Sequence, residues 1–313
     1  MNRFFKLLVL LTGILCVAIG ISFAGTVGTT GAQFLKLATG ARPVGMGETF
    51  VGLADDVNAI YWNPAGLNRI KGKEATFTHA VWFQSMFFSY VAYCQPLDVL
   101  QGKIGGAVRY LSAGKIDKVD KDGNELNESY TPYDFAFTLS YARLVKEIPL
   151  GANIKIINSK IDDKSAMAVA FDFGVIYDKL SLGGRKLSLG LVVQNLGTKM
   201  KFDKEGDPLP LNFRLGSSYK LLDDNLALGL DIKIPLDYTV SAHFGAEYVY
   251  KKIKDIQIAG RIGFKTTTVS DLDVLSGLSL GLGFQWKAYG IDYAWVPYGD
   301  LGNTHRMSLL ARF

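Results

Sequence analysis

The chain has very little cysteine and histidine, and after its first residues it has no long apolar run. Cys16 lies in the N-terminal leader described below, so Cys94 alone remains in the exported chain and no intrachain disulfide can form. His79, His243 and His305 stand far apart, without the spacing of a metal site, so neither a metal nor another cofactor is expected. No later segment reaches the ~18 apolar residues that a membrane-spanning helix needs.

Groupings that would indicate nucleic-acid binding or catalysis are missing as well. The formal net charge is +5 and the basic residues are dispersed, so the sequence offers no basic stripe for nucleic acid. There is no nucleophile elbow and no paired His/Asp setting, so we do not expect an enzyme. The run 120–124 resembles a calcium loop, but Lys118 and Ser129 fall at its first and twelfth ligand positions. A tight turn at Asp122-Gly123 is expected there instead.

The first 24 residues have the pattern of a signal peptide. Arg3 and Lys6 form a basic start, residues 7–21 are apolar, and Ser22-Phe23-Ala24 is a small-residue cleavage site before Gly25. The alternative is an uncleaved N-terminal anchor, for which the apolar run is short. The sequence therefore predicts export and removal of residues 1–24.

What the chain has in quantity is a two-residue alternation. In the run 277–287, large apolar side chains at Leu278, Leu280, Leu282, Phe284 and Trp286 alternate with small or polar ones. Successive side chains of a strand point to opposite faces, so each such strand has one apolar and one polar environment. The 34 glycines suit turns and a crowded interior, and the aromatic content of 12% suits two interfacial girdles. The pattern predicts an all-β transmembrane barrel of the bacterial outer membrane, with lipid outside and polar side chains inside.

Turn residues divide the alternating segments into fourteen predicted strands, an even number as single-chain bacterial barrels require. They are residues 73–82, 86–95, 102–112, 132–145, 150–159, 166–178, 186–196, 210–220, 225–235, 239–250, 255–265, 276–287, 288–297 and 304–313. The long connections, 113–131, 197–209 and 266–275, all follow odd-numbered strands. With both termini in the periplasm, these connections face the cell exterior and the short turns face the periplasm.

Charged residues fall on the inward face of several predicted strands. The set expected to face the lumen is Arg109, Arg214, Asp231, Glu247, Arg261 and Asp292. If residues 221–224 form a hairpin turn, Arg214 lies opposite Asp231 on the neighbouring strand. These charges either pair with one another and hold the interior together, or form a selectivity filter or a site for a ligand head group.

Residues 25–70 do not alternate and precede the barrel at residues 71–313. We expect a short helix or turn, a glycine-rich bend, a helix from about Gly47 to Val57, and a turn at Asn63-Pro64 that leads into the first strand. Asp55 and Asp56 can accept backbone N–H bonds or pair with Arg42. A fourteen-stranded barrel is wide enough to hold such a segment, so residues 25–70 are expected to plug the lumen.

This N-terminal segment also resembles a known family. The runs Phe34-Leu35-Lys36-Leu37, Gly40-Ala41-Arg42-Pro43 and Trp62-Asn63-Pro64-Ala65-Gly66-Leu67, with the C-terminal run 292–306, are similar to the PorV/PorQ family, also catalogued as an uncharacterised spirochaete-type family. The resemblance to the FadL long-chain fatty-acid transporters is more distant. The family resemblance implies a FadL-like barrel with an N-terminal hatch. The hatch motif comprises Arg42, Gly45, Met46, Gly47, Glu48, Asp55, Asp56, Asn63, Pro64, Ala65 and Gly66.

Two functions follow from the resemblance. In FadL-type proteins the hatch gates hydrophobic ligands that leave sideways through a gap in the wall, which implies passive transport or binding of hydrophobic small molecules. Such a gap would be sought at the aromatic second strand, with Phe87, Phe88 and Tyr90, and at Gly105-Gly106 in the third. PorV-like members instead work with a protein secretion system of the type IX kind, which implies a sealed lumen and protein partners.

The chain ends in an aromatic residue that closes the last alternating strand. Phe313 follows Met307, Leu309 and Ala311 on the outward face, and it is expected to act as a recognition signal for the barrel-assembly machinery. The expected partners are therefore outer-membrane lipid and that machinery, together with a hydrophobic ligand or secretion-system proteins, and no nucleic acid.

Overall fold

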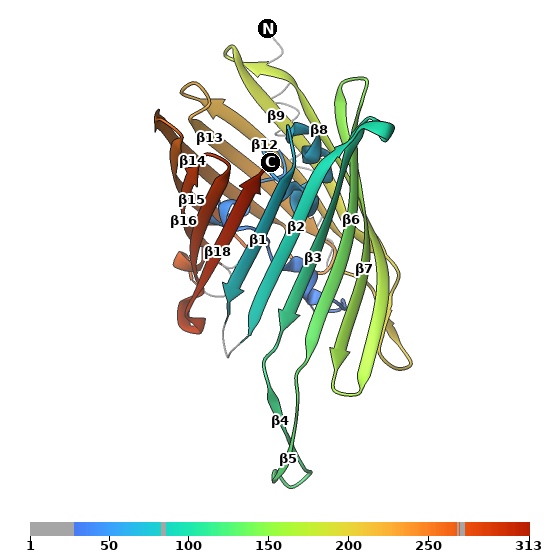
Figure 1. The fold of residues 1–313 in the computed structure, drawn as a ribbon. Helices are drawn as coiled ribbons and strands as arrows, with labels where there is room; N and C mark the ends of the chain where they lie inside the picture. The colour runs from blue at the N-terminus through green and yellow to red at the C-terminus, as the bar shows by residue number, and fades with distance from the viewer. Residues whose placement is uncertain (1–27, 83–85, 268, 270–272) are drawn as a thin grey trace.

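A computed structural model describes residues 28–82, 86–267, 269 and 273–313, and its main feature is a closed barrel of fourteen antiparallel strands (Figure 1). The predicted strand count and architecture are confirmed. The barrel strands are β1 (Glu74–Val81), β2 (Phe87–Leu97), β3 (Gly102–Ser112), β6 (Tyr133–Val145), β7 (Ile148–Ile161), β8 (Lys164–Leu182), β9 (Arg185–Gly197), β12 (Asn212–Leu221), β13 (Leu226–Pro235), β14 (Ser241–Ile253), β15 (Ile256–Lys265), β16 (Leu278–Trp286), β17 (Tyr289–Pro297) and β18 (Asn303–Arg312). Among the described residues, no helix combines the length and apolarity needed to cross a membrane.

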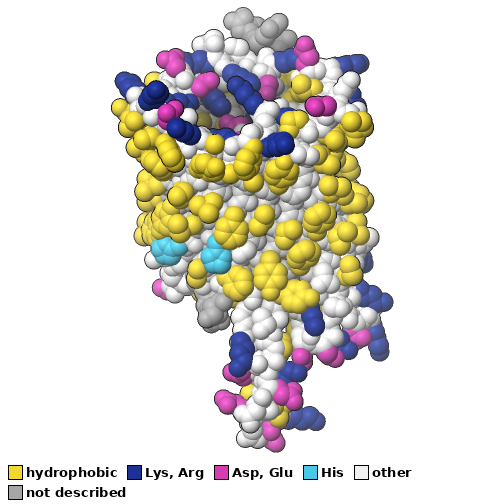
Figure 2. Space-filling view, viewed as in Figure 1, with side chains coloured by type: hydrophobic (Ala, Val, Ile, Leu, Met, Phe, Trp, Pro, Cys, Tyr) yellow, Lys and Arg dark blue, Asp and Glu magenta, His cyan; other side chains and the backbone are white. Residues whose placement is uncertain are grey.

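The alternation in the sequence sorts side chains between the outside and the inside of this barrel. Leu282 on β16 is 64% exposed on the outer wall, whereas Gly281 beside it is buried. Figure 2 shows a broad apolar band across the visible face of the barrel, with charged side chains gathered above and below it. Near one edge of the band, Phe87, Tyr110 and Tyr133 stack across β2, β3 and β6, with ring centroids 5.9 Å and 6.0 Å apart. This is the interfacial aromatic girdle of a membrane barrel.

The two ends of the barrel differ in their connections. One end carries Phe313 and short turns such as 146–147, 183–184 and 254–255, and we call it the turn end. The other carries the longer connections, and we call it the loop end. There, β4 (Ile116–Val119) and β5 (Glu125–Tyr130) form a hairpin that projects from the barrel (Figure 1), and β10 (Met200–Lys201) pairs with β11 (Gly206–Asp207). The 3-10 turns η4 (Leu275–Gly277) and η5 (Gly299–Leu301) also lie at the loop end, and η3 (Asp98–Leu100) lies at the turn end.

Residues 28–70, which we call the luminal segment, lie inside the barrel. They contain the 3-10 turns η1 (Gln33–Lys36) and η2 (Pro64–Arg69) and the short helices α2 (Ala41–Gly45) and α3 (Ala59–Trp62). Most of the segment is buried, and its apolar side chains form the main core together with inward residues of the wall. Phe88, Tyr90 and Cys94 of β2 belong to this core, which explains why β2 is apolar on both faces.

The luminal segment runs through the barrel from the loop end to the turn end. The Gly31 N–H donates to the Pro208 carbonyl at the loop end over 2.9 Å, and the Thr30 hydroxyl bonds to Asp237 there. At the turn end, the Phe313 N–H donates to the Lys73 carbonyl over 2.9 Å. We expected both termini at the same end. The N-terminus lies outside the described residues, and the described chain begins at Gly28, at the end opposite Phe313.

The helix expected from Gly47 to Val57 is not formed. Helical structure stops at Gly45, and the chain then turns sharply because Gly47 and Glu48 both have positive φ angles, each 67°. The free N–H groups of Phe50 and Val51 both donate to the Asp231 carboxylate of β13, at 3.0 Å each. Hydrogen bonds to the barrel wall thus replace the helical hydrogen bonds that the predicted helix would have made.

A track of inward-facing glycines lets the luminal segment approach the wall closely. One glycine on each of eight adjacent strands faces residues 45–65 of the segment: Gly151, Gly174, Gly190, Gly216, Gly229, Gly245, Gly263 and Gly281. A Cβ on Gly263 would lie 1.9 Å from the Gly47 nitrogen, and one on Gly245 would lie 2.3 Å from the Met46 oxygen. Luminal backbone packs against six of these glycines, and the side chains of Asn63 and Thr49 approach Gly174 and Gly229. A Cβ at these positions would crowd the luminal segment, so glycine leaves the room for the approach.

The wall is continuous where we looked for a gap. The β2–β3 ladder runs without a register shift from Phe87–Ser112 to Leu97–Gly102, so the expected break at the second and third strands is wrong. Gly105 serves packing, since a Cβ there would meet the Ile60 side chain at 2.9 Å. Register shifts occur in the β8–β9 and β14–β15 pairs instead.

The glycine track predicts a sharp contrast between two substitutions on β15. We expect Gly263→Ala to destabilise the folded barrel by about 1–3 kcal/mol, because the added methyl overlaps the luminal backbone. Gly260→Ala is the matched control, because nothing lies within 4 Å of a Cβ at that position. Urea unfolding in detergent micelles measures both. Equal stabilities for the two variants would contradict the close approach.

The path of the luminal segment predicts which residues are accessible from each side of the membrane. Thr29→Cys at the loop end should react with an impermeant maleimide on intact cells, as should Asn124→Cys in the β4–β5 hairpin. Glu147→Cys, in a short turn, should react only after the outer membrane is permeabilised. Native Cys94 is buried and should remain unlabelled in all variants. Labelling of Glu147→Cys but not Thr29→Cys on intact cells would reverse the assignment.

Candidate functional site

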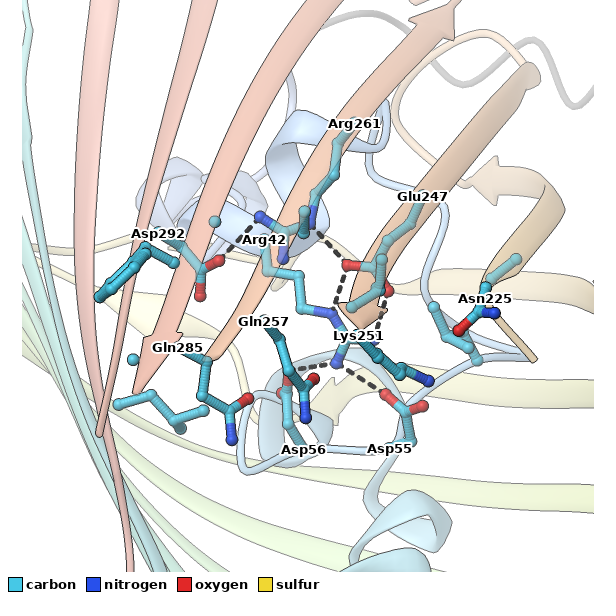
Figure 3. A pocket seen from close by; sticks show the side chains of 18 of the residues that line it. Arg42, Asp55, Asp56, Asn225, Glu247, Lys251, Gln257, Arg261, Gln285 and Asp292 are labelled. Carbon is cyan, nitrogen blue, oxygen red and sulfur yellow. Dashed lines mark hydrogen bonds and ion pairs between the residues drawn. The ribbon is translucent and has the colours of Figure 1, made fainter. Parts of the chain in front are cut away.

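The six charges expected in the lumen all lie on the inner wall, and three of them join the luminal segment in one ionic cluster (Figure 3). Arg42 of α2 donates two hydrogen bonds to Glu247 of β14, Nε–Oε2 at 2.9 Å and Nη2–Oε1 at 2.8 Å. Glu247 also accepts a hydrogen bond from Arg261 of β15 at 2.6 Å, and Arg261 in turn donates to Asp292 of β17 at 2.7 Å. A bidentate guanidinium–carboxylate pair fixes orientation as well as distance, so this cluster positions α2 against the wall.

The same guanidinium also organises the luminal segment internally. Arg42 Nη1 lies 2.7 Å from Asp55 and 2.8 Å from Asp56. The second oxygen of Asp56 accepts the Asn58 N–H at 2.9 Å, just before α3 begins. We call Arg42 with Asp55, Asp56 and Glu247 the Arg42 clamp.

A second ion pair anchors the bend of the luminal segment near the loop end. Glu48 accepts from Lys265 of β15 at 2.6 Å, and both side chains are about nine-tenths buried. The pair joins the turn at Glu48 to strand β15 of the wall, next to the glycine track.

The predicted register between Arg214 and Asp231 is wrong by two residues. Arg214 lies opposite Lys233, and Asp231 lies opposite Gly216. The two charged groups remain within 3.8 Å as a diagonal pair, and both side chains are fully enclosed. The β12–β13 turn is responsible, because the hairpin closes at Leu221–Leu226 and this pairing sets the register of the whole ladder.

Arg109 has a different role from the other lumen-facing charges. Its guanidinium donates to the carbonyls of Phe34, Leu35 and Leu37, at 2.8, 3.2 and 2.6 Å. It also lies 4.7 Å from the Tyr61 ring centroid, a favourable cation–π distance. Arg109 therefore caps η1 rather than lining an ion pathway.

The Asn63-Pro64-Ala65-Gly66 run is explained by crowding where the luminal segment approaches β7 and β8. The Asn63 side chain donates to the Val51 and Val175 carbonyls and accepts from the Ala65 N–H, so it caps η2 and ties it to the wall. A Cβ on Gly66 would lie 2.2 Å from the Ala54 oxygen. The motif is thus a structural joint at the point where the chain leaves the lumen.

Two cavities lie at opposite ends of the filled lumen. The turn-end cavity, about 190 Å³, is lined by the Arg42 clamp together with Lys220, Lys251 and Gln257. Figure 2 shows charged side chains around the hollow at this end, the upper one in the view. The loop-end cavity, about 320 Å³, is lined by aromatic and basic side chains, including Trp82, Tyr298, Lys233 and Arg306. Among the described residues, no three metal-ligating side chains gather at either end or elsewhere.

Sequence reasoning did not single out the loop-end cavity. Its residues come from the luminal segment, the end of β1, β13, β15 and the two ends of the β17–β18 connection, so no local pattern announces it. The only available signal was that Tyr298 and Arg306 fall within the C-terminal run that resembles a family signature.

Comparison with known proteins identifies a family and a fold. The family model described as "Type IX secretion system protein PorV" matches residues 24–237. No curated protein matches the chain.

Several solved structures share the fold at low sequence identity. The Ralstonia pickettii toluene transporter TbuX is 12% identical, with a TM-score of 0.59 over 88% of this chain and 98% of that one. A Pseudomonas aeruginosa FadL homologue is also 12% identical, with a TM-score of 0.57 over 93% and 100% of the two chains. The Pseudomonas putida toluene transporter TodX is 12% identical, with a TM-score of 0.56 over 88% and 96%. The chain therefore has the FadL-like outer-membrane barrel fold.

The Arg42 clamp predicts a large effect from one substitution. Arg42→Gln leaves buried carboxylates without their cation, so we expect a loss of about 3–5 kcal/mol in unfolding free energy. Hydrogen exchange of residues 41–58 should quicken in the same variant. Lys220→Gln is the matched control, because Lys220 contacts Asp55 at 3.4 Å from a more exposed position and should contribute at most about 1 kcal/mol. Exchange rates equal to those of the unsubstituted protein would show that the clamp does not hold the segment.

Proposed function

Because the chain belongs to the PorV family of type IX secretion system proteins, we propose that it is a sealed outer-membrane barrel that serves protein secretion by binding protein partners. The observation that carries this proposal is the filled lumen. The luminal segment packs closely against glycines of eight strands, with backbone against backbone on six of them, and the Arg42 clamp and the Glu48–Lys265 pair hold it in place. A barrel filled in this way suits an assembly component better than a pore.

In this proposal the partner-binding surface is the rim at the loop end. The β4–β5 hairpin projects beyond the membrane band (Figure 1), and Ile116, Val119 and Leu126 expose apolar side chains on it. An isolated two-stranded hairpin is only marginally stable in water. Here a 2.8 Å ion pair between Lys118 and Asp162 braces it against the neighbouring β7–β8 connection. A braced apolar projection is a suitable contact for another protein.

The route to the membrane is part of the same proposal. Residues 1–24 direct export and are removed, although they lie outside the described residues. Phe313, which is 71% exposed at the turn end, serves as the signal for the barrel-assembly machinery. The loop end then faces the cell exterior and the turn end faces the periplasm, in line with the usual loop lengths of such barrels.

The secretion role predicts a specific loss of partners. A double variant, Val119→Lys with Leu126→Lys, should fold but recover few or none of the proteins that the unsubstituted barrel captures from native membranes. Val99→Lys is the control, because Val99 is 90% exposed at the turn end and its apolar side chain lies away from the proposed rim. Deletion of the gene should leave exported proteins inside the cell. A barrel that always purifies alone, with unchanged secretion in the deletion strain, would contradict the proposal.

A second candidate function is the binding of hydrophobic or amphipathic small molecules. The FadL-like fold and the 320 Å³ cavity at the loop end favour it. Passage through the barrel would require the luminal segment to act as a hatch and move, since it separates this cavity from the one at the turn end. Binding at the loop end requires no such movement.

A further inference from the structure

The charged residues of the barrel are divided unequally between its two ends. Each hairpin turn at the turn end has a basic residue in it or within two residues of it, namely Lys103, Lys146, Arg185, Lys220, Lys254 and Lys287. The same turns contain fewer acidic residues. At the loop end, in contrast, residues 116–130 of the β4–β5 hairpin include five acidic and two basic residues. Figure 2 shows Lys and Arg side chains around the rim of the turn end, the upper one in the view.

Arg143 shows where such basic side chains lie relative to the membrane. Ala142 is buried in the core, so the neighbouring Tyr141 and Arg143 both point outward from β6. A tyrosine on the outer wall near a strand end belongs to the girdle at the membrane–water interface. Because a strand rises ~3.3 Å per residue, Arg143 lies roughly 7 Å beyond Tyr141 along the strand. Its guanidinium is therefore placed at the level of lipid head groups, whose phosphates accept charge-assisted hydrogen bonds from Arg and Lys.

The same combination of an aromatic ring and a cation occurs at two other hairpins. The Lys287 ammonium, in the β16–β17 turn, lies 5.4 Å from the centroid of the exposed Trp286 ring, a favourable cation–π distance. On β14, the exposed Lys252 comes two residues after the exposed Tyr250. We call Arg143, Lys252 and Lys287 the basic collar.

The basic collar is available to an anion outside the barrel. All three side chains are exposed, and none of them forms an ion pair with a carboxylate of the described residues. Lys179, which also follows an outward tyrosine, differs because it pairs with Glu147. The cations of the collar therefore lack a partner within the chain, at the level where lipid phosphates lie.

The distribution of the collar around the wall favours lipid over a protein partner. In the order of the barrel, β6 lies six strands from β14 in one direction and six strands from β16 in the other. Arg143 is consequently on the side opposite Lys252 and Lys287. A compact acidic protein would reach one side only, whereas phospholipids surround the barrel and a separate head group can bind at each position.

We propose that the basic collar binds the phosphate groups of anionic phospholipids in the leaflet at the turn end, which is the periplasmic leaflet in the orientation proposed above. The apolar band contacts the acyl chains of the same lipids, and the cations provide the preference for a head group with net negative charge. This site on the outer wall is separate from both cavities and goes beyond the proposed role in secretion.

The test compares two phospholipids that have identical acyl chains and differ in head group. The full chain, purified in a non-ionic detergent, is mixed with equal amounts of phosphatidylglycerol and phosphatidylcholine, and native mass spectrometry counts the bound molecules of each. We expect at least about threefold more phosphatidylglycerol, because each basic residue near the head groups attracts a lipid of net negative charge. The triple variant Arg143→Gln, Lys252→Gln, Lys287→Gln should lose most of this preference. The charge-preserving variant Arg143→Lys, Lys252→Arg, Lys287→Arg should keep it.

The matched control is the triple variant Lys199→Gln, Lys201→Gln, Lys204→Gln, which removes the same charge from exposed positions at the loop end and should leave the ratio of bound lipids unchanged. Heat-dependent mobility in gels establishes that each variant is folded. The proposal is overturned by equal binding of the two lipids to the unsubstituted barrel, by an unchanged ratio in the glutamine variant of the collar, or by an equal loss in the loop-end control. Protein secretion is tested separately by the gene deletion, and none of these results bears on it.

Discussion

The structure depends on one close approach, between the backbone of residues 45–65 and the backbone of the barrel wall. Inward glycines on adjacent strands create the space for it, and at Gly263 a single methyl group would already collide with Gly47. Side chains then need to fill only what remains of the lumen. The barrel and its contents consequently form one packed core, in which neither the strands nor the luminal segment have another partner for their buried faces.

This close approach determines where the charges lie. A segment seated against glycines brings Arg42 within reach of Glu247 and Glu48 within reach of Lys265, so the carboxylates of one element meet the cations of another. Buried ion pairs contribute little net free energy, but they specify one arrangement, because an arrangement that separates the partners leaves a charge unpaired. The clamp thus fixes the register of the luminal segment, while burial of apolar surface supplies most of the stability.

The sequence predicted the barrel well because its strands are governed by a local rule. Alternation such as Leu280-Gly281-Leu282 arises because one face of each strand contacts lipid. The number of strands, and which side chains point outward, could therefore be read from the residues alone. The Gly47–Val57 helix failed because nonlocal bonds from Asp231 replaced the local ones. The Arg214 register failed because the true hairpin turn, which closes at Leu221–Leu226, is two residues longer than the assumed one, and this difference moves every partner. The loop-end cavity was not foreseen, since Lys233, Trp82 and Arg306 share no segment.

The filled lumen also restricts which parts of the barrel a solute or a partner can reach. For a solute to pass from end to end, the luminal segment would have to leave the glycine track. The Arg42 clamp and the Glu48–Lys265 pair would both have to break, because these features follow one another along the barrel axis. The loop-end cavity and the projecting hairpin, in contrast, both lie at the loop end, beyond the glycine track. In the proposed secretion role, the FadL-like fold is a support in the membrane, and the partner-binding surface lies at its loop end.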